Sequence, residues 1–421
     1  MKLKASSAKL WFAISRFTKR IWFRSFIYAV VGVATAFVAL FARDFVPSGY
    51  ATKIGADAVG NILTILASSM LAVATFSLSI MVTAFGNAST GASPRASKLL
   101  IENQSAQRAV ATFIGAFLYS IVGIIALTTG AYGDDGRFVL FLVTIVVIVV
   151  IVVTLIKWVD QLATLGRVGS TIEAVEEATF RELASRAEDP YLGGRKITES
   201  NGQGFVTDIF ANEIGFVALI DTEALQEHCE KQDIEIAVRT VPGSFTYPGR
   251  PLASIRGNIS ALGSSQLSSH FVIERSRTFS QDPRFGFVLL SEIASKALSP
   301  GINDPGTAIE VLNAAVRLFT KRKILREKLA SENSEIRFSR VFVPEMTERE
   351  LIGDVIHPIA RDGAGLFEIG LRIQKILRAL SELDVSYDEG ARYYSALALQ
   401  YSYLKLELDM EKQMVKQAAL V

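Results

Sequence analysis

The sequence has few of the residues that disulfide scaffolds and most metal sites require. Among its 421 residues there is one cysteine, Cys229, and there are three histidines. A lone cysteine cannot form an intrachain disulfide, which is typical of a reducing compartment. His228, His270 and His357 are far apart in the sequence, and His228 beside Cys229 lacks the spacing of a metal-ligand pair. We therefore expect no metal site and no cofactor.

Catalytic and nucleotide-binding signatures are also missing. The chain has no G-x-S-x-G nucleophile elbow, no phosphate-binding P-loop, no G-x-G-x-x-G after a predicted strand and no H-E-x-x-H motif. Its net charge of +2 gives no indication of a nucleic-acid partner. These absences predict a protein that is not an enzyme and does not bind nucleic acid.

Charge is absent from four long stretches, each of which can cross a membrane, since a spanning helix needs about 20 apolar residues. Half of the residues are apolar (50%) and the mean hydropathy is positive at +0.33, a combination that soluble chains rarely show. The first stretch could instead be a signal peptide, but its apolar run is too long and no small-residue cleavage site follows it. We predict an α-helical polytopic membrane protein with four transmembrane helices. The predicted spans lie near residues 25–45, 58–86, 109–131 and 138–157.

The positions of lysine and arginine predict the orientation of these spans. Residues 1–24 contain basic residues and no acid, and the loop between the second and third spans is also basic. We therefore expect a protein of the bacterial inner membrane with both termini in the cytoplasm. Residues 9–23 have one apolar and one basic helical face, which predicts an interfacial helix on anionic lipid headgroups. The alternative is a helix that packs on protein.

The chain after the fourth span is expected to form a cytoplasmic α+β domain that ends in helices. In residues 158–200, a helix should continue from the span to about residue 188 and a linker should follow. Strand patterns with one helix predict a small mixed α/β or partial-barrel subdomain in residues 201–282. Residues 283–421 are predicted to be helical. The expected helices are 284–298, 305–330, 346–360, 364–383 and 388–418.

Three stretches together resemble a known family. They are SPRASKLLIENQSAQRAVATFIGAFLYSIV (93–122), RTFSQDPRFGF (277–287) and ALSPGINDPGTA (297–308). Over nearly its whole length the chain is similar to bacterial predicted membrane proteins grouped as a domain of unknown function, family 2254. The resemblance implies a multi-pass inner-membrane protein with a cytoplasmic C-terminal domain, and it implies no activity. From the resemblance we expect a bulky residue at the position of Gly306, and this chain departs from that expectation.

The second predicted span carries hydroxyl side chains at spacings of three and four residues, so that they share one helical face. None of the four spans contains an acid, a base or a histidine in its apolar stretch, which argues against a proton relay. Two explanations of the hydroxyl stripe stay open. The stripe can be a surface for close helix packing, or it can face water in a pore formed by several subunits. Its residues are Thr64, Ser68, Thr75, Ser79 and Thr83.

The stretch ALSPGINDPGTA joins two predicted helices. Asp304 before Pro305 is a helix-start signal, because Asp caps free N–H groups and Pro needs none, and Asp282 before Pro283 repeats it. Capping therefore explains part of the stretch. The remaining hypothesis is a loop that binds a small charged effector or a cation. Its predicted residues are Asn303, Asp304, Gly301, Gly306, Arg277 and Arg284.

Two functions follow from these predictions. The first is an oligomeric channel-like protein, with the second span along the pathway and the cytoplasmic domain as its gate. A homo-oligomer is expected in that case, since four thin helices enclose little space. The second is a membrane-anchored sensor or scaffold, whose cytoplasmic domain binds an effector or a protein.

Overall fold

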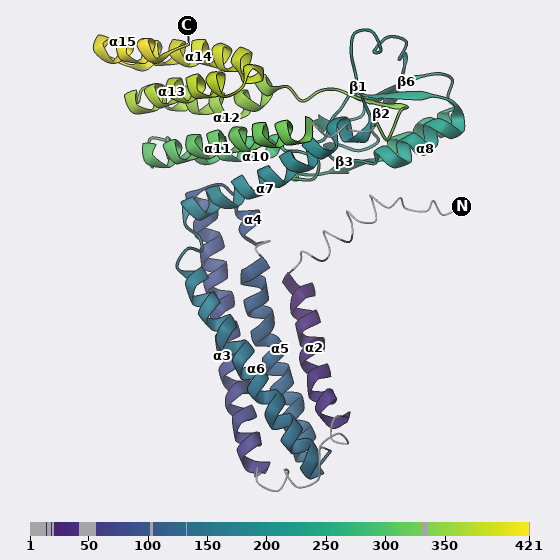
Figure 1. Cartoon of the computed structure of the whole chain (residues 1–421), viewed down its shortest axis with the longest axis vertical. Helices are drawn as coiled ribbons and strands as arrows, with labels where there is room; N and C mark the ends of the chain where they lie inside the picture. Colours follow the sequence, from purple (N-terminus) through teal and green to yellow (C-terminus); the bar gives the residue numbers. More distant parts are fainter. Residues whose placement is uncertain are drawn as a thin grey trace. The chain divides into compact units, whose positions relative to one another are not determined.

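The computed structural model in Figure 1 describes Ile14, Thr18 and residues 21–41, 56–101, 104–131, 133–330 and 336–420. These residues divide into two compact units. The membrane unit holds the described residues within Phe12–Thr90 and Ser97–Ser170. The α+β unit holds those within Gly91–Ala96 and Thr171–Val421. The predicted interfacial helix at residues 9–23 falls mostly outside the described residues.

The membrane unit is helical throughout its described part. Three of its helices contain segments long and apolar enough to cross a membrane, namely Ala58–Gly91, Ser105–Thr128 and Gly136–Leu162. They coincide with the second, third and fourth predicted spans. A shorter apolar segment, Ser25–Phe37, lies where the first span is predicted, so a fourth crossing stays a prediction. The helices are α2 (Ile21–Phe41), α3 (Ala56–Gly91), α4 (Ser97–Ile101), α5 (Gln104–Thr128) and α6 (Gly133–Leu162).

Two glycines allow α2 and α5 to approach closely. A Cβ atom on Gly32 would lie 2.3 Å from the backbone oxygen of Gly115, and one on Gly115 would lie 2.7 Å from the backbone oxygen of Tyr28. Small residues at helix crossings are the usual means of association in membranes. Between α5 and α6, the hydroxyls of Tyr119 and Thr144 form a buried hydrogen bond of 2.8 Å, so these polar groups are satisfied away from water.

The prediction of one helix continuing from the fourth span to residue 188 was wrong. Helix α6 ends at Leu162, and α7 (Val168–Glu188) begins after a turn. In that turn Gly166 has φ +83, and a Cβ on it would lie 3.0 Å from the backbone oxygen of Ala84. A left-handed glycine is a common way to end a helix. No sign of this turn is visible in the sequence, because apolar residues recur at helical spacing on both sides of it, at Leu162, Leu165, Val168 and Ile172.

The α+β unit contains two sheets in its described part (Figure 1). The five-stranded sheet has the order β1-β8-β4-β6-β2, and the three-stranded sheet has the order β5-β3-β7. Their apolar side chains form one core that includes Ile236, Leu252 and Val341. The strands are β1 (Arg195–Lys196), β2 (Thr207–Phe210), β3 (Gly215–Ile220), β4 (Glu235–Val238), β5 (Phe245–Thr246), β6 (Pro251–Arg256), β7 (Phe271–Glu274) and β8 (Val341–Val343).

The predicted boundary between the subdomains at residue 282 does not separate the sheets from the helices. Strand β8 comes from the region predicted to be helical, and it pairs in parallel with β4 and with β1, as Ile236 lies opposite Val341 and Arg195 opposite Phe342. A strand of three residues is too short to produce a clear alternation in the sequence. Its place in the sheet depends on contacts with residues far away in the chain.

The helices of the α+β unit mostly follow the predictions. The exceptions are α9, which was not predicted, and the last predicted helix, which is interrupted at Leu406–Leu408. Buried aromatic side chains join the helices, and the Tyr387 hydroxyl donates a hydrogen bond of 3.0 Å to the backbone oxygen of Phe319. The elements are η3 (Pro190–Gly193), α8 (Thr222–Gln232), α9 (Ala261–Ser268), α10 (Arg284–Ala297), α11 (Pro305–Ala330), α12 (Glu348–Asp362), α13 (Phe367–Leu383), α14 (Val385–Lys405) and α15 (Asp409–Ala418).

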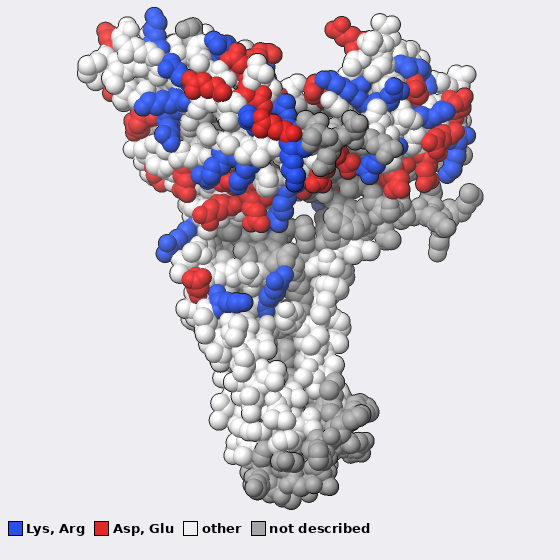
Figure 2. Space-filling view, in the orientation of Figure 1, with Lys and Arg blue, Asp and Glu red and all other residues white. Residues whose placement is uncertain are grey.

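The two units differ in surface charge. Figure 2 shows that the described surface of the membrane unit is nearly free of charged side chains over most of its length, whereas the α+β unit carries many acids and bases. An uncharged helical surface of this kind suits contact with lipid.

Candidate functional site

The hydroxyl stripe of α3 lies on the outside of the described membrane unit. All five predicted stripe residues are exposed. The opposite face of α3 is buried and apolar, and its Met70 and Met81 pack with Phe113 of α5 and Trp158 of α6. Packing against the other described helices of the same chain therefore does not account for the stripe. These exposed residues are Thr64, Ser68, Thr75, Ser79 and Thr83.

Several stripe hydroxyls bond to their own helix. Thr64 donates to the backbone oxygen of Gly60 at 2.8 Å, and Thr83 donates to that of Ser79 at 3.1 Å. Such bonds reduce the cost of placing a hydroxyl in an apolar setting, and they leave the oxygen lone pairs available to an outside donor. The stripe therefore tolerates lipid, a neighbouring helix or water.

Small residues continue the stripe toward the end of α3. At 100° per residue, Ala72 and Gly86 fall on the same face as Ser79. A Cβ on Gly86 would meet nothing within 4 Å, in contrast to Gly32 and Gly115, which touch backbone. Helix α3 has 36 residues and is therefore roughly 54 Å long. The stripe is thus an uncovered small and polar face along a helix longer than the hydrocarbon layer.

The loop between α10 and α11 is held largely by its own backbone. Asn303 N–H donates to the Ser299 oxygen at 2.8 Å, and Asp304 N–H donates to the Ala297 oxygen at 2.8 Å. Asn303 has φ +50, a left-handed conformation that Asn adopts more readily than most residues. A Cβ on Gly301 would meet nothing within 4 Å, so no close contact within the described chain requires glycine there.

Asp304 caps the N-terminus of α11. The Thr307 hydroxyl donates to its Oδ2 at 2.6 Å and the Thr307 N–H donates to its Oδ1 at 3.1 Å. These hydrogen bonds, the hydroxyl first, lower the pKa of Asp304 below its usual value. Capping therefore explains Asp304 and backbone conformation explains Asn303. The effector hypothesis for this loop stays a prediction without a supporting contact.

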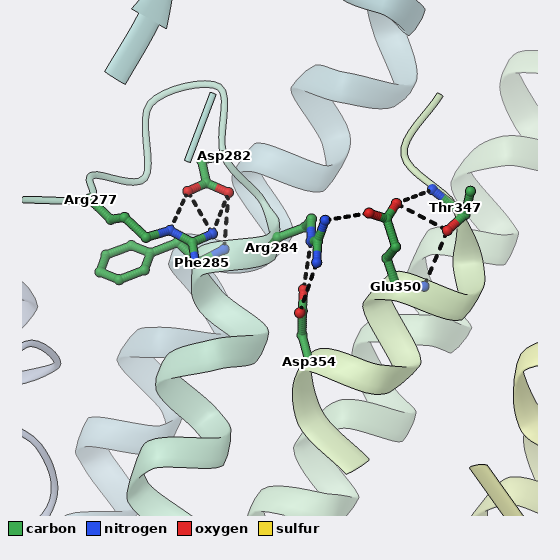
Figure 3. A network of polar contacts seen from close by, with 7 residues as sticks. All are labelled: Arg277, Asp282, Arg284, Phe285, Thr347, Glu350 and Asp354. Carbon is green, nitrogen blue, oxygen red and sulfur yellow. Dashed lines mark hydrogen bonds and ion pairs between the residues drawn. The ribbon is translucent and has the colours of Figure 1, made fainter. Parts of the chain in front are cut away.

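The structure does not place Arg277 and Arg284 beside this loop, as the effector hypothesis required. Both lie at the other end of α10, a helix of 14 residues that is about 20 Å long. Arg277 donates to both carboxylate oxygens of Asp282 at 2.9 and 3.0 Å (Figure 3). Arg284 binds Asp354 at 2.7 and 3.0 Å and Glu350 at 2.6 Å. Acidic partners within the fold thus neutralise both arginines.

Asp282 is the buried centre of the first of these pairs. It is 2% exposed, and its Oδ1 accepts the Phe285 N–H at 3.2 Å at the start of α10 (Figure 3). Burial raises the pKa of Asp282 to about 6, while Arg277 and the Phe285 N–H act in the opposite direction. The carboxylate is therefore ionised at neutral pH. Gly243, with φ +87, leaves room for it, because a Cβ there would lie 2.2 Å from Asp282 Oδ2.

The structure also brings together two histidines that are far apart in the sequence. The rings of His228 and His270 are 5.9 Å apart between centroids. Burial lowers the pKa of His228 and raises the pKa of the Cys229 thiol to about 12, so this thiol is protonated and unreactive at neutral pH. Within the described part of the chain, no group of three or more His, Cys, Asp or Glu side chains could hold a metal ion.

Sequence reasoning missed several charged residues inside the α+β unit, among them Glu176 and Arg322, each 7% exposed. Arg186 on α7 lines a cavity and is partly buried. The signal was present in the sequence, because Arg186 continues the apolar stripe of Ile172, Val175 and Leu183 at helical spacing. A charged residue on a buried helical face needs a structural or functional explanation.

Replacing Asn303 separates its backbone role from a binding role. We expect Asn303→Ala to lower the free energy of unfolding by about 1 kcal/mol, since alanine is disfavoured in the left-handed region. Asn303→Gly should leave it almost unchanged. Urea unfolding of the full-length protein in detergent measures both. A larger loss of unfolding free energy for the glycine variant than for the alanine variant would contradict the backbone explanation. It would instead support a role of the Asn303 side-chain amide in binding.

Comparison with known proteins agrees with the uncharged, membrane-type helices. The family described as "Predicted membrane protein (DUF2254)" matches residues 18–379. The chain belongs to this family. The DUF2254 match extends from α2 into α13, so it includes the membrane helices, the sheets and the Asp282 and Asp304 caps.

Curated relatives of this DUF2254 protein carry no assigned activity. The chain is 24% identical over 267 residues to the Uncharacterized protein MT1328 of Mycobacterium tuberculosis (strain CDC 1551 / Oshkosh), which covers 61% of this chain and 51% of the relative. The Uncharacterized protein Mb1321c of Mycobacterium bovis matches with the same identity and coverage. The chain thus spans about half the length of these relatives. No solved structure matches it.

Proposed function

We propose that this protein forms an oligomeric, channel-like pathway in the bacterial inner membrane, lined by the hydroxyl stripe of α3. The observation that carries the proposal is the exposure of Thr64, Ser68, Thr75, Ser79 and Thr83 on a helix whose other face is buried. A polar face gains nothing from lipid tails, whereas it is stabilised by water or by a polar neighbour. Association of several copies around α3 would place the stripe against a polar neighbouring helix or against water in a shared pathway.

The rest of the exposed surface of α3 suits lipid. Large apolar side chains flank the stripe, among them Ile65, Phe76 and Val82, which are 65%, 66% and 63% exposed. In an assembly around the stripe, the outermost of these side chains would face the hydrocarbon and the others would seal the contact between copies. The basic N-terminal region and the basic loop after α3 support a cytoplasmic location of both termini.

Filling the stripe should close the pathway. We expect wild-type protein to be larger than a monomer in detergent and to release K⁺ and Cl⁻ from vesicles loaded with potassium chloride. The double variant Ser68→Leu with Ser79→Leu should slow this release about tenfold or more, because leucine side chains fill and dehydrate a narrow polar path. Ion-selective electrodes measure release, and size-exclusion chromatography with light scattering measures mass.

The control variant is Thr128→Leu, which replaces an exposed, backbone-bonded threonine of α5 away from the stripe. It should release ions at the wild-type rate. A monomeric wild type that releases neither ion would refute the proposal and favour the membrane-anchored sensor. Equal release by wild type and the double variant would show that α3 does not line the path.

A further inference from the structure

A polar cavity of about 120 Å³ lies within the α+β unit. Its wall is built by α7, η3, the first residue of α8, the residue before Asp282 and the segment before β8. A buried water occupies on the order of 10–15 Å³ by this measure, so the cavity has room for a ligand of about ten heavy atoms. It is too small to enclose a nucleotide. Its polar wall residues include Glu182, Ser185, Arg186, Thr222, Gln281 and Arg337.

Arg186 lines this cavity and makes one hydrogen bond with the described residues. Its Nη2 donates to the backbone oxygen of Gln281 at 2.7 Å. A guanidinium carries a planar fork of further N–H donors. Burial lowers the pKa of Arg186 to about 10, so the side chain is still charged at neutral pH. The cavity therefore contains a cation with free donors.

Two of the three nearby acids pair with arginines other than Arg186, and the third, Glu182, is a charged residue of the cavity wall that accepts a backbone N–H. Asp189 pairs with Arg337, and Glu182 accepts the Gln281 N–H at 3.1 Å. Asp282, the acid with the largest attraction on Arg186, is held by Arg277 through both oxygens. No ion pair within the described chain includes Arg186, although three acids lie in its electrostatic reach.

The geometry around Arg186 is rigidly set. Gln281 has φ +54, and its side chain accepts the Ile220 N–H at 2.9 Å and donates to the Ile220 oxygen at 3.2 Å. This fixes the carbonyl that binds Arg186. Thr222 starts α8, and its hydroxyl donates to the Leu192 backbone oxygen at 3.0 Å, while the Asp221 carboxylate caps the N-terminus of this helix.

We propose that this cavity binds a small oxyanion, the phosphate or carboxylate group of a small metabolite, on the free face of Arg186. The Ser185 hydroxyl at the cavity wall supplies a further donor. Charge-assisted hydrogen bonds from a guanidinium to such oxygens are strong and directional. The ligand would contact α7, the first helix after the membrane unit. This inference does not depend on the proposed pathway, because binding is measured without ion release.

Calorimetric titration of the full-length protein in detergent tests the site, with sodium phosphate and sodium succinate as separate probes and sodium chloride at equal ionic strength as the blank. We expect saturable heat with at least one probe. Arg186→Gln should weaken binding about tenfold or more, because the charged donors are lost. Binding of phosphate alone would assign the site to phosphate groups, and binding of succinate alone would assign it to carboxylates.

Two further variants keep the test decisive. Ser185→Leu changes an exposed residue of the cavity wall. It should block the cavity and weaken binding while leaving Arg186 in place. This variant tests the site if Arg186→Gln does not fold. Arg392→Gln removes an exposed arginine paired with Asp388 and should bind as wild type does. The proposal is overturned if wild type shows no saturable heat with either probe, or if Ser185→Leu and Arg186→Gln both bind normally.

Discussion

Asp282→Ala is expected to lower the free energy of unfolding of the α+β unit by roughly 3 kcal/mol. The substitution leaves the Arg277 guanidinium without its bidentate partner and the Phe285 N–H without its acceptor. Removing one member of a buried ion pair is costly because the other charge stays desolvated. The estimate is at the lower end of the usual range, since the Arg277 side chain is 21% exposed and can be partly rehydrated.

Asp304→Ala is the matched control, because the same Asp-Pro start occurs there on an exposed surface. Its carboxylate accepts hydrogen bonds from the first turn of its own helix, chiefly from Thr307, so we expect a loss of about 1 kcal/mol, the usual value of a helix cap. Urea unfolding of both full-length variants in mild detergent, followed by circular dichroism, gives the comparison. Equal losses for the two variants would mean that the buried pair with Arg277 adds nothing to stability.

Gly32→Val is expected to destabilise the membrane unit by about 3 kcal/mol, the upper end of the usual range for overpacking. A Cβ at this position would lie 2.3 Å from the Gly115 oxygen, and backbone cannot move aside as a flexible side chain can. Helices α2 and α5 would have to separate along their contact. They would lose the dispersion contacts that hold helices together in lipid, where no hydrophobic effect drives their association.

Gly60→Ala provides the control for this prediction. A Cβ on Gly60 would meet nothing within 4 Å, so we expect a change of less than about 1 kcal/mol, in the direction of greater helix stability. Unfolding of the detergent-solubilised protein by sodium dodecyl sulfate measures both variants. If Gly32→Val unfolds at the same detergent fraction as Gly60→Ala, then the close contact of α2 with α5 is not required.

The proposed pathway and the proposed ligand site can fail separately. Loss of ion release in the stripe variants with normal phosphate or succinate binding would support both. Binding without any ion release would leave the α+β unit as a sensor attached to a membrane anchor. Ion release without binding would support the pathway and remove the Arg186 cavity as a regulatory site.

Local patterns in the sequence were sufficient for the long helices and their starts. Three long apolar segments lie where an uncharged stretch predicts them, because a membrane helix satisfies its backbone internally and needs only length and apolarity. The helices α10 and α11 begin where Asp-Pro predicts, since capping acts within a few residues. The family assignment also came from sequence stretches alone.

Features that depend on distant residues were not accessible in this way. The turn at Gly166, the strand β8 and the break after α14 each interrupt or interleave elements whose local patterns looked continuous. The effector hypothesis counted Arg277 and Arg284, one helix away, among the binding residues of the loop at Asn303. Helix α10, of 14 residues, separates both arginines from Asn303, and Arg284 forms ion pairs with Glu350 and Asp354 of α12.

The sequence by itself determined that this is a helical membrane protein with an α+β unit, that α10 and α11 start at Asp-Pro sequences, and that one helix carries a hydroxyl stripe. These properties depend on hydropathy, periodicity and capping, which act between residues near in the chain. Only the tertiary structure decided that the stripe of α3 lies outside, that Asp282 is buried while Asp304 is exposed, and that Arg186 faces a cavity. Burial depends on which distant segments cover a surface, and no local pattern contains that information.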